Sequence, residues 1–476
     1  MTDKNKMRTL LVAALKEGLE TIKEKVPVKD DGLFWFFKKH RDYPIVSYFN
    51  SGLPSFQLSE YEKRNFSAIL SERDFAKSIS SWKAYSDFIL SDDQICKYFE
   101  IGSHSPEDRL GENNLEIYII YNSIFTYYFL SHLTDTYIHR YGYEFNEIFC
   151  EQLFEKIYRS IFLEKSPIEI VVPIIFLRFD FNEINLTDSI TIRRMDENFQ
   201  KARNYRTSYT NSAHPVVVGA ASHAIVLKFW DITNNKYEER EKALYEFSAY
   251  KSSQQTIDML FAAIRIATGH ETGYCQIIAK PYNWEFNPTA DLEKIYVVSE
   301  RNYPIHFENF GWLKEKEVLT SKHAERIKDV YSKIVALPMF ELAIRRLNSA
   351  CNRITEDDSI IDITIALESI LTSDTKTEIG YRLATRAALL CKLEPFNNLS
   401  SELIFEMCKK IYDFRSTVVH GSIKKKKVIK TIKVTPEKEI EIVRYGIDFL
   451  AHIITVIAKR PEIKSVKDID KLLHLK

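Results

Sequence analysis

The chain has 476 residues, the length of about three ordinary domains, which leaves ample chain for a hydrophobic core. Its composition, 45% hydrophobic and 28% charged with only 13 glycines and 14 prolines, excludes fibrous, linker-rich and low-complexity proteins. Lys and Arg balance Asp and Glu at 66 each, yet residues 321–476 hold 28 basic and 21 acidic side chains, so this third is basic and the remainder is acidic. A basic region favours a polyanionic partner, although a run of charge is more often a solvated face.

The N-terminal sequence predicts a charged amphipathic helix over residues 1–25 and lacks the apolar core of a secretory signal. The six cysteines are scattered with no CxxC pair, which predicts free thiols rather than a zinc ribbon or a disulfide framework. No stretch of about 18 uncharged apolar residues occurs, so we expect no membrane span and no membrane partner. Together these features predict a cytoplasmic protein.

Hydrophobic periodicity divides the chain into three regions and predicts an α+β multidomain protein. Residues 1–165 show helical, aromatic-rich patterns and predict an α-rich N-terminal domain. Residues 166–320 hold short β-branched or aromatic runs and predict an α+β middle domain with a helix near residues 253–268. Residues 321–476 return to helical patterns and predict an all-α domain. The expected strands span residues 168–181, 188–195, 223–232, 274–280 and 294–300, and the expected C-terminal helices span residues 321–354, 359–372, 377–392, 400–420 and 436–459.

Several widespread enzyme motifs are missing from the sequence. Without GxGxxG or a lysine-containing phosphate loop, dinucleotide- and ATP-dependent activities lose support, and without GxSxG or HExxH so do serine hydrolases and zinc proteases. His132, Asp135 and His139 would share one helix face and could bind a metal ion, but no fourth ligand is evident and we favour a surface or capping role. GHETGYC, at residues 269–275, is best explained as a turn leading into a strand. We therefore expect neither a metal nor a cofactor.

The most informative segment is residues 403–427, LIFEMCKKIYDFRSTVVHGSIKKKK. Apolar residues recur there every three to four positions and predict a buried helical stripe. The stripe consists of Leu403, Met407, Ile411, Phe414 and Val418.

A polar line lies beside this stripe. Tyr412, Ser416 and His420 are spaced four residues apart, with Arg415 one turn from Tyr412. Gly421 predicts the end of the helix, where His420 can reach a groove. On an ideal helix Arg415 and His420 point about 140° apart. Either the last turn departs from α geometry, or a symmetry-related helix from a second subunit completes the site.

This segment resembles the Arg-x4-His signature of the HEPN superfamily, and YDFRSTVVHG is similar to the Apea-like HEPN branch. Residues 360–390 are also similar to that branch, with an apolar helix holding Asp and Glu followed by a helix with two arginines. The resemblance covers residues 321–460 and implies a helical bundle, usually dimeric, of a kind often found as metal-independent ribonucleases in toxin and antiviral defence systems. Ser422 stands where a related branch has a tyrosine that receives AMP, so that form of control is not implied.

The residues suit such chemistry. RNA carries its own nucleophile, the 2′-OH, so cleavage needs a group that moves protons and a cation that stabilises charge developing on the phosphate. We assign the first role to His420, because imidazole exchanges protons near neutral pH, and the second to Arg415, whose forked side chain is always charged. The expected products are a 2′,3′-cyclic phosphate and a 5′-hydroxyl. RNA phosphates would be held without sequence readout by the lysines that follow: Lys424, Lys425, Lys426, Lys427, Lys430 and Lys433.

Supporting roles fall to neighbours of this pair. Tyr412 and Ser416 lie beside it, and Asp413 either orients Arg415 or forms a surface salt bridge. Because buried carboxylates need partners, two acidic residues upstream are expected to pair with two arginines of the next helix. These are Asp362 and Glu368 with Arg382 and Arg386.

The leading hypothesis is a cytoplasmic, homodimeric HEPN endoribonuclease, a toxin or antiviral defence effector acting on RNA. In this hypothesis the acidic residues 1–320 sense a trigger or restrain the nuclease by docking over its basic groove, or else they recruit substrate. The alternative is a non-catalytic HEPN module that binds RNA or a protein partner. The intact pair of Arg415 and His420 favours catalysis.

Overall fold

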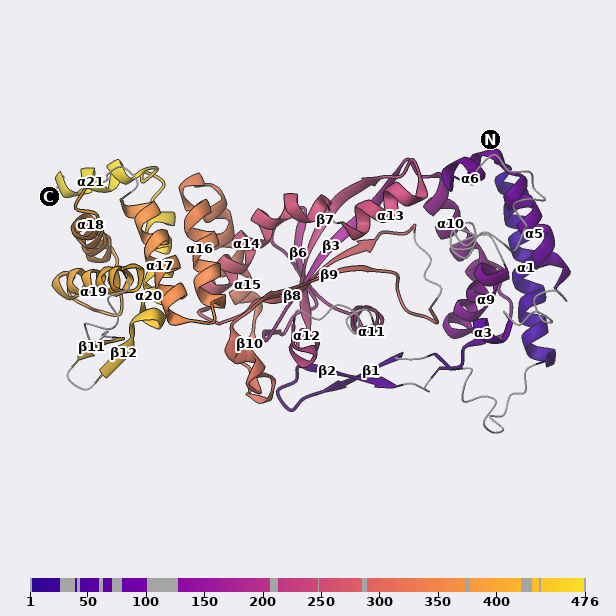
Figure 1. Cartoon of the computed structure of the whole chain (residues 1–476), viewed down its shortest axis with the longest axis horizontal. Coiled ribbons are helices and arrows are strands. Elements are labelled where there is room, and N and C mark those ends of the chain that lie inside the picture. The colour runs from indigo at the N-terminus through magenta and orange to yellow at the C-terminus, as the bar shows by residue number, and fades with distance from the viewer. Residues whose placement is uncertain are drawn as a thin grey trace.

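The structure, a computed structural model, describes residues 2–25, 39–40, 43–59, 63–70, 79–100, 127–205, 213–246, 248–284, 289–372, 377–420, 430–435 and 438–474. The molecule is elongated, with one group of helices at each end and a β-sheet between them (Figure 1). This arrangement confirms the expected mixture of helices and sheet. None of the helices in the described part of the chain has the length and apolar character needed to cross a bilayer.

The N-terminal helices enclose a hydrophobic core of their own. Helix α1 packs on α5, α9 and α10, and its apolar face meets Trp82 and Phe154 in the interior. Asn146 starts α10 by accepting hydrogen bonds from the first backbone N–H groups of that helix, as an N-cap does. The helices of this end are α1 (Lys4–Lys25), α3 (Phe66–Leu70), α5 (Ser80–Ser91), α6 (Asp93–Tyr98), α9 (Tyr127–Tyr141) and α10 (Glu147–Phe162).

The central sheet has six antiparallel strands in the order β5-β6-β7-β3-β8-β9. Strand β3 lies in its middle and is buried on both faces, which explains its nearly continuous apolar sequence: Ile170 and Val172 face one core and Val171 faces another. Four of the five expected strand segments are confirmed. The expected run over residues 168–181 is divided, because β3 ends at Ile174 and β4 (Arg178–Phe179) pairs with residues 318–319 outside this sheet; the short edge strand β5 was not predicted. The strands are β3 (Lys165–Ile174), β5 (Glu183–Asn185), β6 (Ile190–Arg194), β7 (His223–Thr233), β8 (Tyr274–Pro281) and β9 (Tyr296–Asn302).

Different elements cover the two faces of this sheet. The long helix α14 (Ser248–Thr268) packs on the face that contains Ile170, close to the expected helix. The opposite face is covered by α11 (Glu197–Tyr205), α12 (Pro215–Gly219) and a hairpin of β1 (Tyr43–Tyr48) and β2 (Pro54–Ser59). Smaller elements join these layers: β4 (Arg178–Phe179), α13 (Tyr237–Tyr245), η2 (Ile305–Glu308), η3 (Gly311–Leu313) and β10 (Val318–Leu319).

The β1–β2 hairpin belongs by sequence to the N-terminal region but packs beneath the central sheet (Figure 1). Its turn contains Gly52 at φ +74°, and a Cβ there would lie 2.5 Å from Cζ of Arg178. Both the backbone conformation and the close approach of the arginine therefore require glycine. Periodicity did not predict this hairpin.

The C-terminal helices surround α17, which contacts α16, α18, α19 and α20. The helix expected over residues 321–354 is divided at Pro338, because proline disrupts a continuing helix. The helix expected over residues 436–459 begins only at Ile442, since a β-hairpin precedes it. The elements are α15 (Ser321–Val335), η4 (Pro338–Phe340), α16 (Glu341–Asn352), α17 (Glu356–Leu371), α18 (Ile379–Leu393), α19 (Ser401–Val419), β11 (Thr431–Thr435), β12 (Lys438–Glu441), α20 (Ile442–Ala458) and α21 (Val466–His474).

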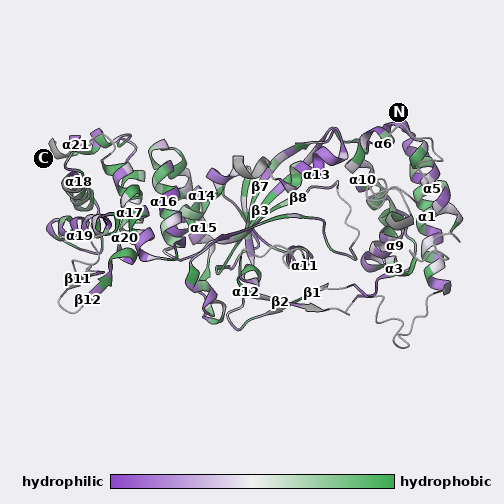
Figure 2. Ribbon diagram, viewed as in Figure 1, coloured by the Kyte–Doolittle hydropathy of each residue, from purple (hydrophilic) through white to green (hydrophobic). Residues whose placement is uncertain are grey.

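The sheet and the C-terminal helices share one hydrophobic core. Helix α14 contacts the sheet on one side and α15 and α16 on the other, so buried residues run without interruption from Ile170 through Leu260 to Leu347. Figure 2 shows that helices at both ends carry hydrophobic as well as hydrophilic residues, as expected for helices with one buried side. The expected C-terminal helical region therefore begins at Ser321 as a run of helices, but its hydrophobic core continues into α14 and the central sheet.

Candidate functional site

The Arg-x4-His segment forms the second half of α19. Ser400 caps this helix, and the expected stripe faces the interior: Met407, Ile411 and Phe414 are buried. The ends of the stripe, Leu403 and Val418, are partly buried against the same core. Helix α19 packs on α17 and α18, which hold its polar line at the surface of the bundle.

Arg415 is half-buried beside α17. Its Nε is buried and makes no hydrogen bond to any residue within the described ranges, and its Cζ lies 6.0 Å from the centre of the Tyr412 ring. Burial raises the pKa of Glu368 on α17, and the positive charge of Arg415 partly offsets this, so the two groups lie near one another. The guanidinium thus retains donor capacity for a ligand.

His420 is the C-cap of α19 and is exposed to solvent. Its backbone N–H donates to the carbonyl of Ser416 at 3.1 Å, while its ring forms no hydrogen bond or ion pair with the part of the chain that the structure describes. The helix therefore ends next to the expected position. Gly421, the expected terminator, lies outside the described residues.

The side chains next to Arg415 and His420 lie in different environments. The ring of Tyr412 packs on Gly380 at the start of α18, where a Cβ would come within 3.1 Å of it. Asp413 is exposed, and among the described residues its carboxylate forms no ion pair with Arg415. Ser416 directly follows Arg415 in α19 and is half-buried.

The expected RNA-binding lysines, Lys424, Lys425, Lys426 and Lys427, all lie outside the described residues. Lys430 is described, and its ammonium lies 2.5 Å from the carboxylate of Glu356 on α17. Because both side chains are exposed, this pair is weak and is open to competition from a phosphate.

The expected partners of the buried carboxylates were wrong. Asp362 binds Arg346 at 2.6 Å and Arg353 at 2.7 Å. Arg386 instead binds both carboxylate oxygens of Asp470 on α21 at 2.8 and 2.6 Å. The error arose because the prediction considered only the next helix, whereas Asp362 faces α16 and Arg386 faces α21.

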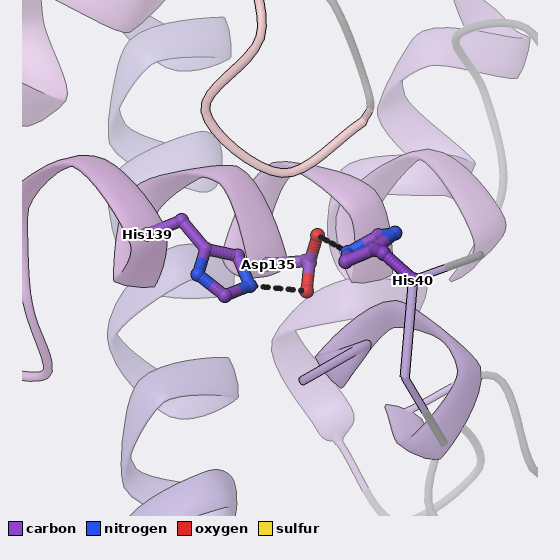
Figure 3. A group of neighbouring side chains, drawn as sticks. All are labelled: His40, Asp135 and His139. Atoms are coloured by element: carbon purple, nitrogen blue, oxygen red, sulfur yellow. Dashed lines mark hydrogen bonds and ion pairs between the residues drawn. The ribbon is translucent and has the colours of Figure 1, made fainter. Parts of the chain in front are cut away.

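A second cluster of chemically capable side chains lies among the N-terminal helices (Figure 3). Asp135 and His139 of α9 meet His40, and one ligand atom from each lies within 4.8 Å of the others. His132, which the sequence placed on the same helix face, does not belong to this group. His40 was missed because it lies 95 residues away along the chain.

The protein itself supplies partners for the ligand atoms of this cluster. The carboxylate of Asp135 accepts the backbone N–H of Phe66 at 2.8 Å and lies 2.9 Å from Nε2 of His40. Nε2 of His139 lies 2.7 Å from the carbonyl of Arg64. Burial raises the pKa of Asp135, but the hydrogen bonds and charges of the two histidines outweigh it and lower that pKa well below its usual range. These bonds satisfy a buried carboxylate and start α3, so a capping role agrees with them and a surface role does not.

The segment GHETGYC is structural, as expected. Gly273 precedes β8 and lies so close to β9 that a Cβ would meet the carbonyl of Asn302 at 2.1 Å. Glu271 binds His306 at 3.0 Å and Arg444 of α20 at 3.1 Å, which joins this turn to the C-terminal helices.

Sequence reasoning also missed a cleft of about 640 Å³ between the N-terminal helices and the sheet. Basic residues from α9, α10, β6 and β8 line it: Arg140, Lys156, Arg193, Arg194 and Lys280. The only local signal was the Arg193-Arg194 pair at the end of an apolar strand. The comparisons with known proteins found no matching family model, no similar curated protein and no similar solved structure.

Proposed function

We propose that this protein is a HEPN-type endoribonuclease that uses His420 to move protons and Arg415 to bind the reacting phosphate. One observation carries the proposal: the end of one helix presents an exposed imidazole together with a guanidinium whose buried Nε makes no hydrogen bond to the described residues. Structural arginines of this protein such as Arg240 and Arg346 also leave a buried Nε unpaired, but each binds the protein through its other nitrogens. Arg415 differs because none of its nitrogens forms a hydrogen bond or ion pair with the described residues, so its whole guanidinium can donate to a ligand.

The proposed step needs only RNA and these two side chains. A neutral imidazole accepts the proton of the 2′-OH as the 2′-oxygen attacks phosphorus. The bond to the 5′-oxygen breaks, and that oxygen leaves with a proton returned by an imidazolium. The guanidinium donates hydrogen bonds to the phosphate oxygens that gain negative charge in the transition state. The products are a 2′,3′-cyclic phosphate and a 5′-hydroxyl.

Two copies of the chain complete the site in this proposal. Arg415 is half-buried against α17 whereas His420 is exposed at the end of α19, so the two side chains of one copy do not face a common point on a regular helix. A two-fold axis beside α19 would bring the arginine of one copy toward the histidine of the other. The lysines at residues 424–427 follow His420 closely in the sequence, so a dimer would carry two such runs.

Substitution of each member of the pair tests the activity. His420→Ala and Arg415→Ala should each lower the rate of RNA cleavage by at least about a hundredfold, the usual range for loss of an acid–base group or a charge-stabilising donor. Lys410→Ala, which removes an exposed cation from the same helix, is the matched control and should retain activity. If both variants fold and cleave like the wild type, the proposal fails.

A mixing experiment tests the shared site. Dimers that contain one Arg415→Ala copy and one His420→Ala copy keep one intact site if each site takes its arginine and histidine from different copies. A mixed dimer should have about half of the wild-type rate, and an equal mixture with random pairing, in which half of the dimers are mixed, should recover about a quarter, while each variant alone stays inactive. An inactive mixed dimer would show that each copy builds its own site.

The biological role that we propose is that of a toxin or antiviral defence effector. An RNA-binding module without catalysis would share the fold, and it would bind RNA equally well with and without His420 while cleaving none. Growth arrest on expression of the wild type, but not of His420→Ala, is the result expected of an effector.

A further inference from the structure

The cleft between the N-terminal helices and the sheet has an excess of positive charge. Its lining holds six Lys and Arg residues and four Asp and Glu residues, on a volume of about 640 Å³ that suits a small ligand. Five of the six cations come from four separate elements, the sixth, Lys294, precedes β9, and all of them line one space. Their source in different parts of the fold distinguishes the cleft from a charged stripe on one helix.

Part of this charge is neutralised within the protein. Arg193 binds Glu169 at 2.8 Å, Lys280 binds Glu293 at 2.6 Å, and Lys294 lies 4.0 Å from Glu241. A further carboxylate of the lining, Asp196, accepts the backbone N–H of Phe199 and so caps α11.

The remaining cations have no carboxylate partner. Among the residues that the structure describes, no carboxylate lies within 4.0 Å of the charged groups of Lys156, Arg140 or Arg194. Arg140 donates to the carbonyl of Leu292 at 3.1 Å, and Arg194 reaches the carbonyl of Phe179 at 3.5 Å. These carbonyl oxygens position the side chains of Arg140 and Arg194 but do not neutralise their positive charge.

Lys156 is the most exceptional of the three. It is partly buried on α10, and burial together with the charges of Arg140 and Lys280 lowers its pKa, an effect that the charge of Glu293 only partly offsets. A charged lysine in this position costs free energy in the empty cleft, and a bound anion would remove that cost.

The rim of the cleft adds an aromatic surface. Tyr282 follows β8, and its side chain is 54% exposed although it lines the cleft. An exposed ring beside a cationic floor can stack on a planar base while phosphates bind below it. The interspersed carboxylates are suited to accept hydrogen bonds from sugar hydroxyls, and they disfavour a continuous polyanion such as an RNA strand.

We propose that this cleft binds a nucleotide, with its phosphates on Lys156, Arg140 and Arg194 and its base on Tyr282. The site is independent of the proposed ribonuclease centre. It lies where the N-terminal helices meet the sheet, so an occupant contacts both and links the positions of these two parts.

Calorimetric titration of the full-length protein with ATP, AMP, inorganic tripolyphosphate, adenosine and a single-stranded RNA oligonucleotide tests the proposal. We expect ATP to bind, tripolyphosphate to bind more weakly and adenosine not to bind detectably. Lys156→Gln should weaken ATP binding by at least about tenfold, the value of one charge-assisted hydrogen bond. Tyr282→Ala should weaken ATP binding but leave tripolyphosphate binding unchanged.

The controls separate a lost site from a damaged fold. Lys328→Gln removes an exposed charge from α15, far from the lining, and should not change binding. Lys156→Gln should melt no lower than the wild type, because it removes a charge that the empty cleft disfavours. The proposal is overturned if no phosphate compound binds, if Lys156→Gln binds ATP as tightly as the wild type, or if only a longer RNA oligonucleotide binds. Because the readout is binding, RNA cleavage has no bearing on it.

Discussion

The C-terminal helices and the N-terminal helices are attached to the sheet in different ways. Helix α14 lies between the sheet and α15 and α16, and residues such as Leu260 and Leu347 belong to one continuous apolar core. The N-terminal helices keep a separate core. Their junction with the sheet includes buried polar groups: Arg240 donates to the carbonyl of Ser160 at 2.5 Å, and the hydroxyl of Tyr98 donates to Asn234 at 2.6 Å.

This difference predicts which parts of the molecule unfold together. An apolar core is lost cooperatively, so the sheet and the C-terminal helices should behave as one unit. A junction of hydrogen bonds beside an open cationic cleft can adjust without exposing a core. The proposed nuclease therefore lies in the unit that includes the sheet, and the proposed nucleotide site lies at the adjustable junction.

The largest expected effect comes from the shared core. Leu347→Ala should lower the free energy of unfolding by about 2–5 kcal/mol, the usual cost of such a cavity. In a Trp82→Phe background, which removes the tryptophan of the N-terminal core, urea unfolding followed by far-UV circular dichroism and by tryptophan fluorescence should shift together, because Trp230 and Trp284 pack in the shared core. Val335→Ala, at an exposed position, should change stability by less than about 0.5 kcal/mol. A shift confined to the helical signal would show that the C-terminal helices fold independently.

The pH dependence of unfolding provides a second test, at a buried histidine of the sheet. Burial lowers the pKa of His223 on β7 to about 4, where its Nε2 donates to the carbonyl of Phe181 at 2.7 Å. Between pH 6.5 and 4, His223 binds a proton in the unfolded chain but not in the folded protein, so the stability that neutral His223 contributes falls as the pH falls, by about 3 kcal/mol in total.

The matched variant for this test is His223→Gln, which keeps a donor but does not titrate. The difference in unfolding free energy between wild type and variant should shrink or reverse toward pH 4. Asp258 in α14 acts oppositely, since burial raises its pKa to about 6, so only the difference between the two proteins isolates the histidine. If the difference in unfolding free energy between the two proteins stays constant from pH 7 to 4, the lowered pKa of His223 is contradicted.

The smallest expected effect is at the polar junction. Arg240 is 2% exposed, and its guanidinium lies 4.7 Å from the centre of the Trp284 ring. Arg240→Ala should cost about 1–2 kcal/mol, and hydrogen exchange should increase in α6, α10 and α13 but not in α17. Lys242→Ala, an exposed change on the same helix, is the control. Equal loss of protection in α17 would mean that the whole molecule opens as one unit.

The sequence predicted elements better than their contacts. Periodicity located the strands of the sheet and α17 to α19, because alternation and three-to-four spacing are local consequences of burial. It missed the β1–β2 hairpin, whose glycine turn depends on Arg178 from another region. Periodicity could not reveal that α14 joins two of the expected domains, since the apolar face of a helix does not indicate which element packs against it.

The candidate sites show the same limit. The end of α19 at His420 followed from local pattern, whereas the partners of Asp362 and the approach of His40 to Asp135 depend on tertiary packing. Charge balance over long segments indicated a basic C-terminal third, but it concealed the cationic cleft in the acidic remainder. Net charge averages over a region, whereas a binding site depends on which charges converge.

Analysis of RNA product ends tests the central claim most directly. Purified full-length protein is incubated with a labelled single-stranded RNA in the presence of EDTA, beside His420→Ala and Lys410→Ala. The account predicts fragments with 2′,3′-cyclic phosphate and 5′-hydroxyl ends from the wild type and from Lys410→Ala, and no fragments from His420→Ala. Fragments with 3′-hydroxyl and 5′-phosphate ends, or equal cleavage by His420→Ala, would contradict it.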